Sequence, residues 1–565
     1  MIRDLGAGEA HASSPLEYDL VVIGSGPAGG VMAAELRRSR PDLSICVLES
    51  GRMRPGVFGD KLRRTPYPGA GIRIKPHSRE RVLGGASTTW SGLSSPMDPI
   101  EMEARPWLEQ SGWPMSRAEL DVYYQAAAER YRFAPPIAFD PNSKDEAGLG
   151  SIRAKGAFQP TWLAVEEKIF MAAEEPQDFG AELKHIYETG GVDLLLDASV
   201  TRLEFGDGAA RVAHIGTSTG ATFELRAQTF VVATGGIENA RLLLNSGAPN
   251  EHDVIGRYMM NHPKNYSGIV TLRKPTRSLP YFFGCIWKGF AGYGGLRLPD
   301  AEQRKEQLVN SYVRFEPLFP WSDNRGVEAL VHLVKRSKFL LTGWKKTKKD
   351  ELIELRDYSE TGDDSELDEE HLSYFGLVAR LLRHLPSVLA YVKSRLLDRG
   401  GPMIKRVRIR NFMEMEPRRE NRVELSAESK DVDVFGMRLP LVKHDTNERD
   451  RRSLIRLQEA LRVELARTGF GDLAMDLMDQ ESWPINQDAS HHIGTTRMGS
   501  DPATSVVDAN LLLHATSNLY VSGASVFPTS GCANPTYTIV ALAVRLAEHL
   551  AEALPRQQAD AEISC

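Results

Sequence analysis

A group of three glycines between an apolar strand and a helix constrains the fold of this chain more than any other feature. Gly24, Gly26 and Gly29 follow the run DLVVIG and lie where the helical run AGGVMAAELRRSR begins, which leads into a second apolar run, LSICVLES. The first glycine permits a tight turn, the second lets the backbone approach a phosphate, and the third lets helix and strand pack closely. The helix N-terminus adds free N–H groups and a partial positive charge. Residues 24–29 (GSGPAG) are therefore predicted to hold the pyrophosphate of a dinucleotide within a βαβ unit.

An acidic residue supports this interpretation. Glu49 lies 20 residues beyond Gly29 (49 − 29), at the end of the second predicted strand. A carboxylate at that place can accept hydrogen bonds from both ribose hydroxyls, which favours a ribose without a 2′-phosphate. The glycines and Glu49 do not distinguish a nicotinamide from a flavin dinucleotide.

The length of the chain indicates two lobes, because 565 residues exceed what one simple core holds. We predict an α/β fold, α+β overall, with a Rossmann-like dinucleotide-binding domain made of residues 17–100, 190–255 and 488–565. A substrate-binding domain of sheet plus helices is predicted from residues 101–189 and 256–487, with a helical insert at about 328–400. Residues 1–16 are expected to be a disordered leader.

Composition excludes several classes of protein. The formal net charge of −6 is small for this length and gives no footprint for nucleic acid. Four dispersed cysteines show no C-x-x-C spacing, so neither a disulfide framework nor a zinc site is predicted. We see no signal-peptide pattern and no uninterrupted apolar stretch of membrane-spanning length, and we therefore predict a cytoplasmic protein.

Four further stretches resemble the glucose-methanol-choline (GMC) family of FAD-dependent alcohol oxidases and dehydrogenases. Three of them are residues 83–92 (LGGASTTWSG), 231–241 (VVATGGIENAR) and 255–263 (IGRYMMNHP). The fourth and most specific is residues 491–499 (HHIGTTRMG), followed by Val507-Asp508, 518–528 (NLYVSGASVFP) and 534–536 (NPT). Their order and spacing match the family. The STTW segment and the NPT ending look most like pyranose oxidases, bacterial glycoside 3-oxidases, and fructose and gluconate dehydrogenases.

The resemblance implies FAD as cofactor. Thr89 stands where pyranose oxidases carry a flavin-linked histidine, so the FAD is expected to be held non-covalently. The implied cofactor-binding residues are Gly24, Ser25, Gly26, Pro27, Ala28, Gly29, Glu49, Gly84, Gly85, Ser87, Thr88, Thr89, Trp90, Ser91, Val200, Ala233, Thr234, Gly235, Gly523, Ala524, Pro535 and Thr536.

The resemblance also implies the catalytic residues. In the family's H-x-x-G-T pattern the general base is His491, which takes the hydroxyl proton while hydride passes to flavin N5. Asn534 stands at the second active-site position, and Pro535 begins a helix whose N-terminus is expected to face the flavin. We interpret His492 as a packing residue and His262 as structural. A metal on the histidine pair is disfavoured because further ligands are missing, and Ser525 lacks the G-x-S-x-G elbow of a hydrolase.

The function predicted from the sequence is oxidation of a sugar or glycoside hydroxyl to a carbonyl. Oxidation of a primary alcohol, as in an aminoglycoside-type sugar, a sterol or an aliphatic alcohol, is the close alternative. A non-catalytic flavin-binding protein is the remote one. The sequence leaves open whether oxygen, a quinone or a cytochrome re-oxidises the flavin, and it leaves open the oligomeric state, a homo-oligomer included.

The predicted insert contains two basic amphipathic stretches, residues 331–356 and 374–399, separated by an acidic linker at 360–370. Such stretches dock on membranes or partners. The alternative is a lid or subunit contact with an ordinary solvated face.

Overall fold

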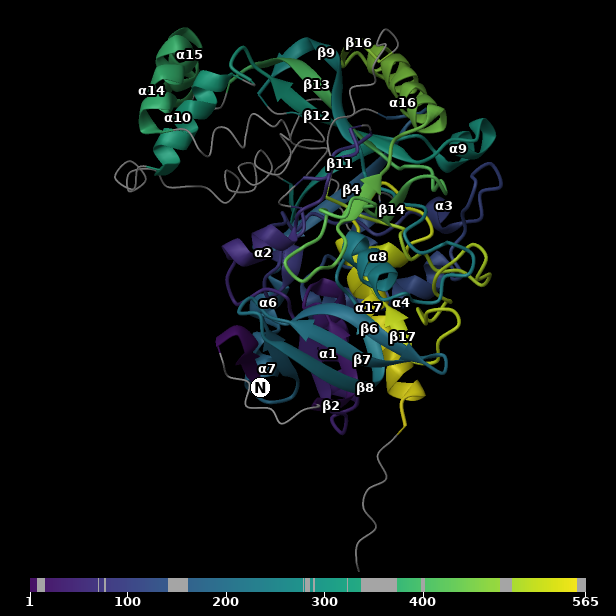
Figure 1. Cartoon of the computed structure of the whole chain (residues 1–565). Coiled ribbons are helices and arrows are strands. Elements are labelled where there is room, and N and C mark those ends of the chain that lie inside the picture. Colours follow the sequence, from purple (N-terminus) through teal and green to yellow (C-terminus); the bar gives the residue numbers. More distant parts are fainter. Residues whose placement is uncertain are drawn as a thin grey trace, which may run out of the picture.

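Two lobes make up the computed structural model, one above the other in Figure 1. The structure describes residues 1–7, 16–69, 71–75, 78–140, 161–277, 279, 285–287, 290–322, 324–336, 373–397, 402–477 and 490–555. The lower lobe contains the predicted dinucleotide-binding unit, and the upper lobe is built on a second sheet. The α/β fold and the two-lobed organisation therefore agree with the sequence.

The lower lobe is organised by an eight-stranded sheet of order β1-β5-β3-β2-β8-β7-β6, with β17 paired to β8. Its strands are β1 (Ile2–Asp4), β2 (Leu16–Ile23), β3 (Ile45–Leu48), β5 (Asp193–Leu196), β6 (Ser199–Gly206), β7 (Ala209–Gly216), β8 (Thr222–Val232) and β17 (Leu519–Val521). β2 runs parallel to both β3 and β8. Helix α1 (Pro27–Ser39) joins β2 to β3, which confirms the βαβ unit.

Helices and short turns complete this lobe. The long C-terminal helix α17 (Thr536–Ala553) packs against α1 and against α4 (Arg117–Tyr131). The others are η1 (Leu5–Ala7), α2 (Val57–Leu62), η2 (Gly85–Thr88), α6 (Phe179–Glu182), α7 (Lys184–Glu188), α8 (Gly236–Asn245) and η4 (Ala524–Val526). Two short helices lie closer to the upper sheet: α3 (Pro99–Met102), near β14 (Arg422–Leu425) in Figure 1, and η3 (Pro136–Phe139), which contacts both α4 and β4 (Glu166–Ala173).

Two predicted boundaries differ from the structure. The first residues of the expected disordered leader form an edge strand, because Ile2–Asp4 pairs in parallel with Leu194–Leu196. The backbone of β5 at the edge of the sheet gives these residues a partner. Residues 8–15 lie outside the described residues. Leu120, Tyr124 and Phe179, from the stretch assigned to the substrate domain, pack in the core of the lower lobe instead. Burial of these side chains against α17 and α1 overrides their position in the sequence.

The upper lobe is built on a seven-stranded sheet of order β10-β11-β12-β13-β9-β16, with β4 paired to β11. Its strands are β4 (Glu166–Ala173), β9 (Lys264–Thr276), β10 (Cys285–Trp287), β11 (Phe290–Arg297), β12 (Ser311–Leu318), β13 (Ile404–Met413) and β16 (Gly471–Ala474). Helix α16 (Glu448–Arg467) packs on this sheet, α9 (Asp300–Glu306) precedes β12, and β14 (Arg422–Leu425) pairs with β15 (Pro440–Lys443).

Helices α10 (Arg325–Arg336), α14 (Tyr374–Arg383) and α15 (Leu385–Leu397) form the described part of the predicted insert between β12 and β13. They pack against one another at the upper left of Figure 1. The predicted acidic linker lies outside the described residues. Within the described chain no single helix is long and apolar enough to cross a membrane; α14 and α15 together pass that test by length and composition, with a bend of 89° between them.

Candidate active site

The three glycines of the predicted pyrophosphate cradle differ in what surrounds them. A Cβ on Gly24, whose φ is +106°, would lie 2.5 Å from the carbonyl oxygen of Ala233, and one on Gly29 would lie 2.1 Å from that of Gly24. These two positions accept only glycine because the backbone packs against itself. A Cβ on Gly26 would meet nothing within 4 Å. The open space at Gly26, at the N-terminus of α1, is where a phosphate can approach the backbone.

Glu49 lies beside this cradle. It follows β3, is 5 % exposed, and accepts hydrogen bonds from Ser25 Oγ at 2.6 Å and from the backbone N–H of Gly51 at 2.8 Å. The backbone N–H of Ala198 donates to the Glu49 carbonyl at 2.9 Å, so β6, which carries Val200, begins close to Glu49. The carboxylate is thus fixed where the parallel strands end, as a ribose partner requires.

The glycine-serine loop contacts the same cradle. The backbone N–H of Gly84 donates to Ser25 Oγ at 3.2 Å, and a Cβ on Gly85 would lie 3.3 Å from Gly26 Cα. Ser87 Oγ caps the loop by donating to the Gly84 carbonyl at 2.7 Å. The rest of the predicted stretch, Thr88, Thr89, Trp90 and Ser91, continues from this turn; the Trp90 indole donates to the Gln177 carbonyl at 2.6 Å. Residues far apart in sequence therefore meet at the predicted dinucleotide site.

Asn239 joins two further predicted segments. Its Oδ1 accepts from the backbone N–H of Thr234 at 2.7 Å, and its Nδ2 donates to the Ser522 carbonyl at 3.0 Å and to Ser525 Oγ at 2.8 Å. The loop of Ala233, Thr234 and Gly235 after β8 is thereby fixed to the loop that contains Gly523 and Ala524. Gly523 has a φ of +108°, and a Cβ added to it would lie 3.8 Å from the Ala28 side chain. This loop therefore also borders α1.

Two histidines from distant segments meet in the structure. Met260 and Ile493 form an antiparallel bridge, each backbone N–H donating to the other's carbonyl at 2.9 and 3.0 Å. His262 lies two residues after Met260, and His491 lies two residues before Ile493. The two histidines face each other with their Nδ1 atoms 2.9 Å apart. The register of the bridge brings the predicted base, His491, against His262, for which the sequence predicts only a structural role.

The proton positions on this pair follow from the other side of the His262 ring. His262 Nε2 lies 3.1 Å from the Ser530 carbonyl oxygen, which can only accept, so Nε2 carries a proton. Burial lowers the pKa of His262 to about 4, which keeps the ring neutral at neutral pH and makes its Nδ1 an acceptor. His491 Nδ1 is therefore the donor, and in the neutral His491 ring the basic lone pair lies on Nε2.

Asn534 follows the same loop that accepts the bond from His262. Its Nδ2 donates to the Leu93 carbonyl at 2.7 Å, which fixes the orientation of the amide. A primary amide has a second N–H group that can serve a substrate oxygen. Pro535 is the N-cap residue of α17, and Thr536 is its first helical residue. The helix thus begins one residue later than predicted, because the Pro535 carbonyl already accepts the first helical bond, from Ile539.

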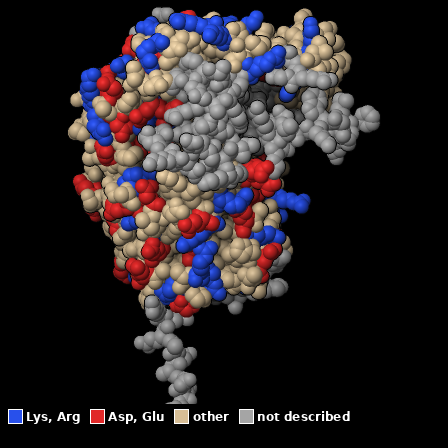
Figure 2. All heavy atoms as spheres, turned by 180° about the vertical axis from the view of Figure 1, so that it is seen from behind, with Lys and Arg blue, Asp and Glu red and all other residues tan. Residues whose placement is uncertain are grey.

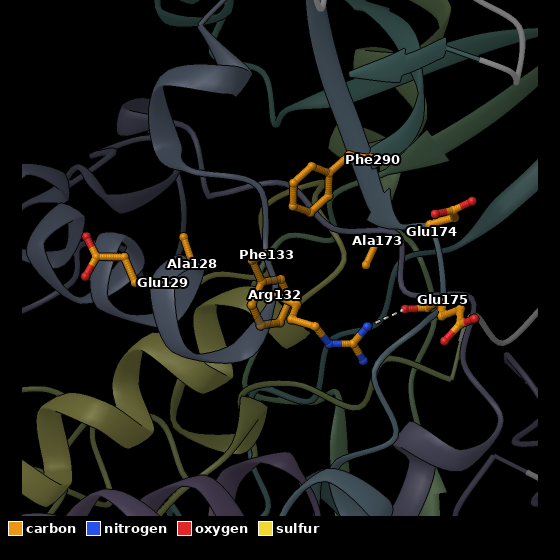
Figure 3. Close-up of a pocket in the computed structure, with 8 residues that line it drawn as sticks. All are labelled: Ala128, Glu129, Arg132, Phe133, Ala173, Glu174, Glu175 and Phe290. Atoms are coloured by element: carbon orange, nitrogen blue, oxygen red, sulfur yellow. Dashed lines mark hydrogen bonds between the residues drawn. The ribbon is translucent and has the colours of Figure 1, made fainter. Parts of the chain in front are cut away.

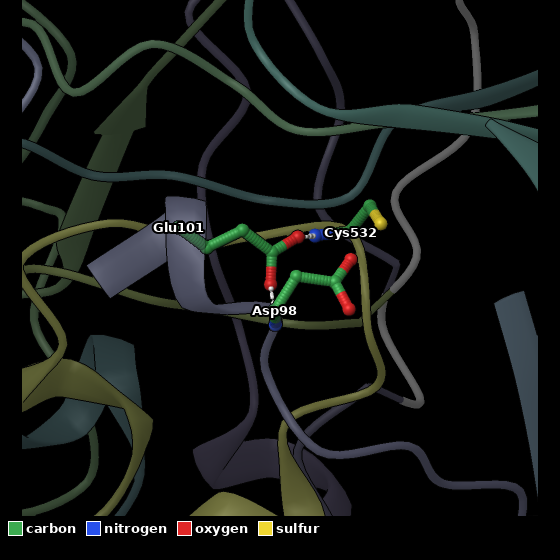
Figure 4. A group of neighbouring side chains, drawn as sticks. All are labelled: Asp98, Glu101 and Cys532. Atoms are coloured by element: carbon green, nitrogen blue, oxygen red, sulfur yellow. Dashed lines mark hydrogen bonds between the residues drawn. The ribbon is translucent and has the colours of Figure 1, made fainter. Parts of the chain in front are cut away.

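A buried acidic group supports the loop of residues 530–534. Asp98, Glu101 and Cys532 lie together in Figure 4, with one ligand-type atom of each within 4.8 Å of the others. Their oxygens already have partners: Asp98 pairs with Lys168 Nζ at 2.7 Å, and Glu101 accepts from the backbone N–H groups of Asp98 and Cys532 at 2.7 and 2.8 Å. Burial would raise the pKa of Asp98, but attraction to Arg297 and Lys168 lowers it below its usual range. The Lys168 ammonium thus supplies a positive charge to this acidic group.

A surface hollow of about 650 Å³ lies beside the predicted cofactor residue Trp90, whose ring centroid is 6.4 Å from that of Phe133 in the lining. Figure 3 shows it between the end of α4 and the strands β4 and β11, where Arg132 donates to the Glu175 carbonyl at 3.3 Å. None of the residues that line it is predicted to bind the cofactor or to act in catalysis; they are Ala128, Glu129, Arg132, Phe133, Ala173, Glu174, Glu175 and Phe290. We assign this hollow no part in the reaction.

Comparison with known families identifies the chain. Family models described as GMC oxidoreductase match residues 180–264 and residues 417–543. The chain belongs to the GMC oxidoreductase family. The first match covers the strands and the loop around Ala233, and the second covers His491 and Asn534.

Proteins named for their activity are similar to this GMC oxidoreductase over nearly its whole length. Paromamine 6'-oxidase of Streptomyces fradiae is 23 % identical over 94 % of this chain and 91 % of its own. The fructose dehydrogenase large subunit of Gluconobacter japonicus is 27 % identical over 95 % and 98 %. The crystal structure of pyridoxine 4-oxidase from Mesorbium loti has a TM-score of 0.54 at 17 % identity, over 94 % and 99 % of the two chains, and shows the likeness of fold.

This GMC oxidoreductase is an FAD-dependent enzyme that oxidises alcohols or carbohydrates. Its residues fit that cofactor, since the open space at Gly26, the fixed carboxylate of Glu49 and the loop at Gly85 come together where the sequence predicts a dinucleotide. Whether the flavin is bound covalently stays a prediction from Thr89.

Sequence reasoning missed the role of His262. The residue occurs in a stretch that resembles the family, but the bond to His491 depends on the register between residues 260 and 493, which no local pattern displays. The support of the 530–534 loop by Glu101 was missed for the same reason.

Proposed function

We propose that this enzyme oxidises a hydroxyl of a sugar or glycoside to a carbonyl, with His491 as general base. The single observation that carries the mechanism is the hydrogen-bonded series from Ser530 through His262 to His491. This series favours the His491 tautomer whose Nε2 can accept a proton. The similarity to enzymes named for paromamine and fructose supports a carbohydrate substrate.

Each residue has one task in the proposed reaction. His491 Nε2 accepts the proton of the substrate hydroxyl, and its Nδ1 keeps donating to His262, so the ring stays in one orientation while it gains a proton. Asn534 donates its second amide N–H to the substrate oxygen and holds the reacting carbon in place. When bound, FAD supplies the acceptor for the hydride from that carbon.

The predicted cofactor contacts are part of the same proposal. Gly24 to Gly29 and the N-terminus of α1 hold the pyrophosphate, and Glu49 holds the ribose. The start of α17 at Pro535 and Thr536 faces the flavin, where a helix N-terminus favours negative charge. The FAD is held without a covalent bond, because Thr89 replaces the linking histidine.

Anaerobic flavin bleaching tests the assignment of the base. The His491→Ala enzyme, loaded with FAD and mixed with a panel of sugars and glycosides, is expected to bleach about 100-fold to 10,000-fold more slowly, the usual contribution of a general base. His492→Ala is the matched control, because it removes the adjacent imidazole and is expected to leave the rate unchanged. Equal bleaching by the wild type and His491→Ala would contradict the proposal.

The product identifies the hydroxyl that reacts. A ketone supports oxidation of a secondary sugar hydroxyl. An aldehyde supports the alternative of a primary alcohol, as the named activity of the paromamine 6'-oxidase suggests. Mixing the reduced enzyme with oxygen and then with a quinone distinguishes an oxidase from a dehydrogenase. Failure of every alcohol to bleach the flavin would favour a non-catalytic flavin-binding protein.

A further inference from the structure

Helices α14 and α15 carry large apolar side chains on their solvent-facing sides. The most exposed are Phe375, Leu396 and Leu397, at 83 %, 74 % and 69 %. Exposed apolar residues also recur along each helix, at Tyr374, Val378 and Leu382 in α14 and at Leu385, Leu389 and Leu396 in α15. The spacings of four and seven residues place each set on one side of its helix. A concentration of exposed apolar side chains of this kind marks an interaction site.

The opposite sides of these helices are already packed. Leu377 in α14 and Val388 in α15 are buried, and both helices contact α10. A Cβ on Gly326 in α10 would lie 2.4 Å from the His384 side chain, so the bend between α14 and α15 is pressed against α10. The exposed apolar stripes therefore do not belong to the core of the insert. They face outward from the three packed helices α10, α14 and α15.

The charges on this surface have one sign. Residues 373–397 contain no Asp or Glu and four cationic side chains, Arg380, Arg383, Lys393 and Arg395. Arg383 and Lys393 are exposed. In Figure 2 the upper right of the molecule, where this insert lies in that view, is mostly tan with some blue. Cationic side chains beside apolar stripes complement an anionic lipid surface, where headgroups pair with the charges and the apolar residues enter the acyl boundary.

Helix length determines how such a surface meets a bilayer. α14 and α15 contain 10 and 13 residues, so they are roughly 15 and 20 Å long at 1.5 Å per residue. Each is shorter than the roughly 30 Å hydrocarbon core. The two helices together are as apolar as a membrane span but are bent by 89°. This geometry suits two helices that lie in the interface better than one helix that crosses it.

We propose that the exposed side of α14 and α15, which we call the docking surface (residues 374–397), binds the enzyme peripherally to membranes that contain anionic lipid. This inference goes beyond the oxidation reaction and does not depend on it. The predicted location in the cytoplasm would place the enzyme at an anionic leaflet.

Vesicle co-sedimentation of the FAD-loaded enzyme tests the docking surface. Wild type is expected to sediment with vesicles of phosphatidylcholine and phosphatidylglycerol, to bind phosphatidylcholine vesicles more weakly, and to dissociate as salt is raised. The double variant Phe375→Ser/Leu389→Ser is expected to lose at least ten-fold in partitioning. Arg383→Gln and Lys393→Gln are expected to lose about five-fold each.

A matched control changes exposed apolar residues elsewhere. Val122 in α4 and Val463 in α16 are 67 % and 60 % exposed, and Val122→Ser/Val463→Ser is expected to bind vesicles as wild type does. Flavin absorbance and the unfolding midpoint establish that each variant is folded. The proposal is overturned if wild type does not bind anionic vesicles, or if the Phe375→Ser/Leu389→Ser variant binds as tightly. It is also overturned if light scattering shows that this variant separates a wild-type dimer, because a second copy would then cover the surface.

Discussion

Removing the acceptor behind the proposed base is the sharpest test of the site. His262 accepts from His491 Nδ1 at 2.9 Å and donates to the Ser530 carbonyl at 3.1 Å. His262→Leu abolishes both bonds, whereas His262→Gln offers an acceptor and a donor on one side chain. We therefore expect the leucine variant to lose base function and the glutamine variant to retain most of it. His262 acts in this reasoning as a positioning residue, because it touches the base and not the substrate.

The size of the effect follows from the bonds lost. A buried polar group left without its partner costs about 1–3 kcal/mol. If this penalty appears in the transition state, it corresponds to roughly a five-fold to 150-fold lower rate, since about 1.4 kcal/mol is tenfold. Stopped-flow measurement of anaerobic flavin reduction with saturating substrate gives this rate directly. His514→Gln is the control, because His514 Nε2 makes a single hydrogen bond at 3.0 Å to Ser505.

The same residue predicts a pH dependence of stability. The pKa of His262 is lowered to about 4, below the roughly 6.5 of an unfolded histidine, so the unfolded chain binds more protons between these values. Stability is therefore full above pH 6.5 and is lost as pH falls toward 4. The 1.5 pH units from 6.5 to 5 contribute about 2 kcal/mol at 1.36 kcal/mol each. Denaturant unfolding of the FAD-loaded wild type and His262→Gln at pH 7.5 and 5 measures this difference.

Three results would refute the reasoning about His262. Flavin reduction by His262→Leu at the wild-type rate would show that the base needs no acceptor. Equal impairment of the leucine and glutamine variants, both with bound FAD, would show that the residue serves packing alone. A wild-type stability that falls no more steeply with acid than that of His262→Gln would show that the buried ring is not held neutral.

Three further experiments test the surroundings of the site. Gly26→Ala is expected to leave the apoprotein fold intact and weaken FAD binding, because its Cβ enters open space, whereas Gly29→Ala should reduce the yield of folded protein; flavin titration and circular dichroism separate the two. Gly531 has a φ of +58°, and a Cβ added to it would lie 2.7 Å from the Glu101 carboxylate, whereas Gly247 has a φ of +63° and open space around it. Gly531→Ala should therefore slow flavin reduction more than Gly247→Ala, and equal rates would count against the role of the 530–534 loop. Arg105→Met leaves a buried carboxylate without its cation and should lower the free energy of unfolding by about 3–5 kcal/mol, and a loss below 1 kcal/mol would contradict this.

Local patterns were sufficient for the dinucleotide-binding unit. Gly24, Gly26 and Gly29 act through their own backbone and the strand beside them, so their spacing predicts the turn, the helix and the open space. The C-terminal strand and α17 were predictable for a similar reason, since each is a continuous apolar pattern. Periodicity reports such elements because it reflects burial along one segment.

The edge strand at Ile2–Asp4 and the contribution of α4 to the lower core were not predictable in this way. A three-residue strand has no period to recognise, and it forms because β5 offers an unpaired edge. Tyr124 is buried because it packs on Tyr537, whose ring centroid lies 4.7 Å away, although more than 400 residues separate them along the chain (537 − 124). Tertiary contacts determine both the edge strand and the burial of Tyr124. These contacts cannot be recognised from the residues that are neighbours along the chain.

The loop of residues 530–534 explains how the two proposed catalytic residues act together. The Ser530 carbonyl accepts from His262, which orients the base, and the Cys532 backbone N–H is held by Glu101. Asn534, at the end of the same five residues, is fixed to the Leu93 carbonyl. Three anchors, two from residues 93–101 and one from His262, thus restrain one short loop. Because the orientation of His491 and the position of Asn534 both depend on that loop, a disturbance at any anchor should reach both residues at once, even though the anchor never touches the substrate.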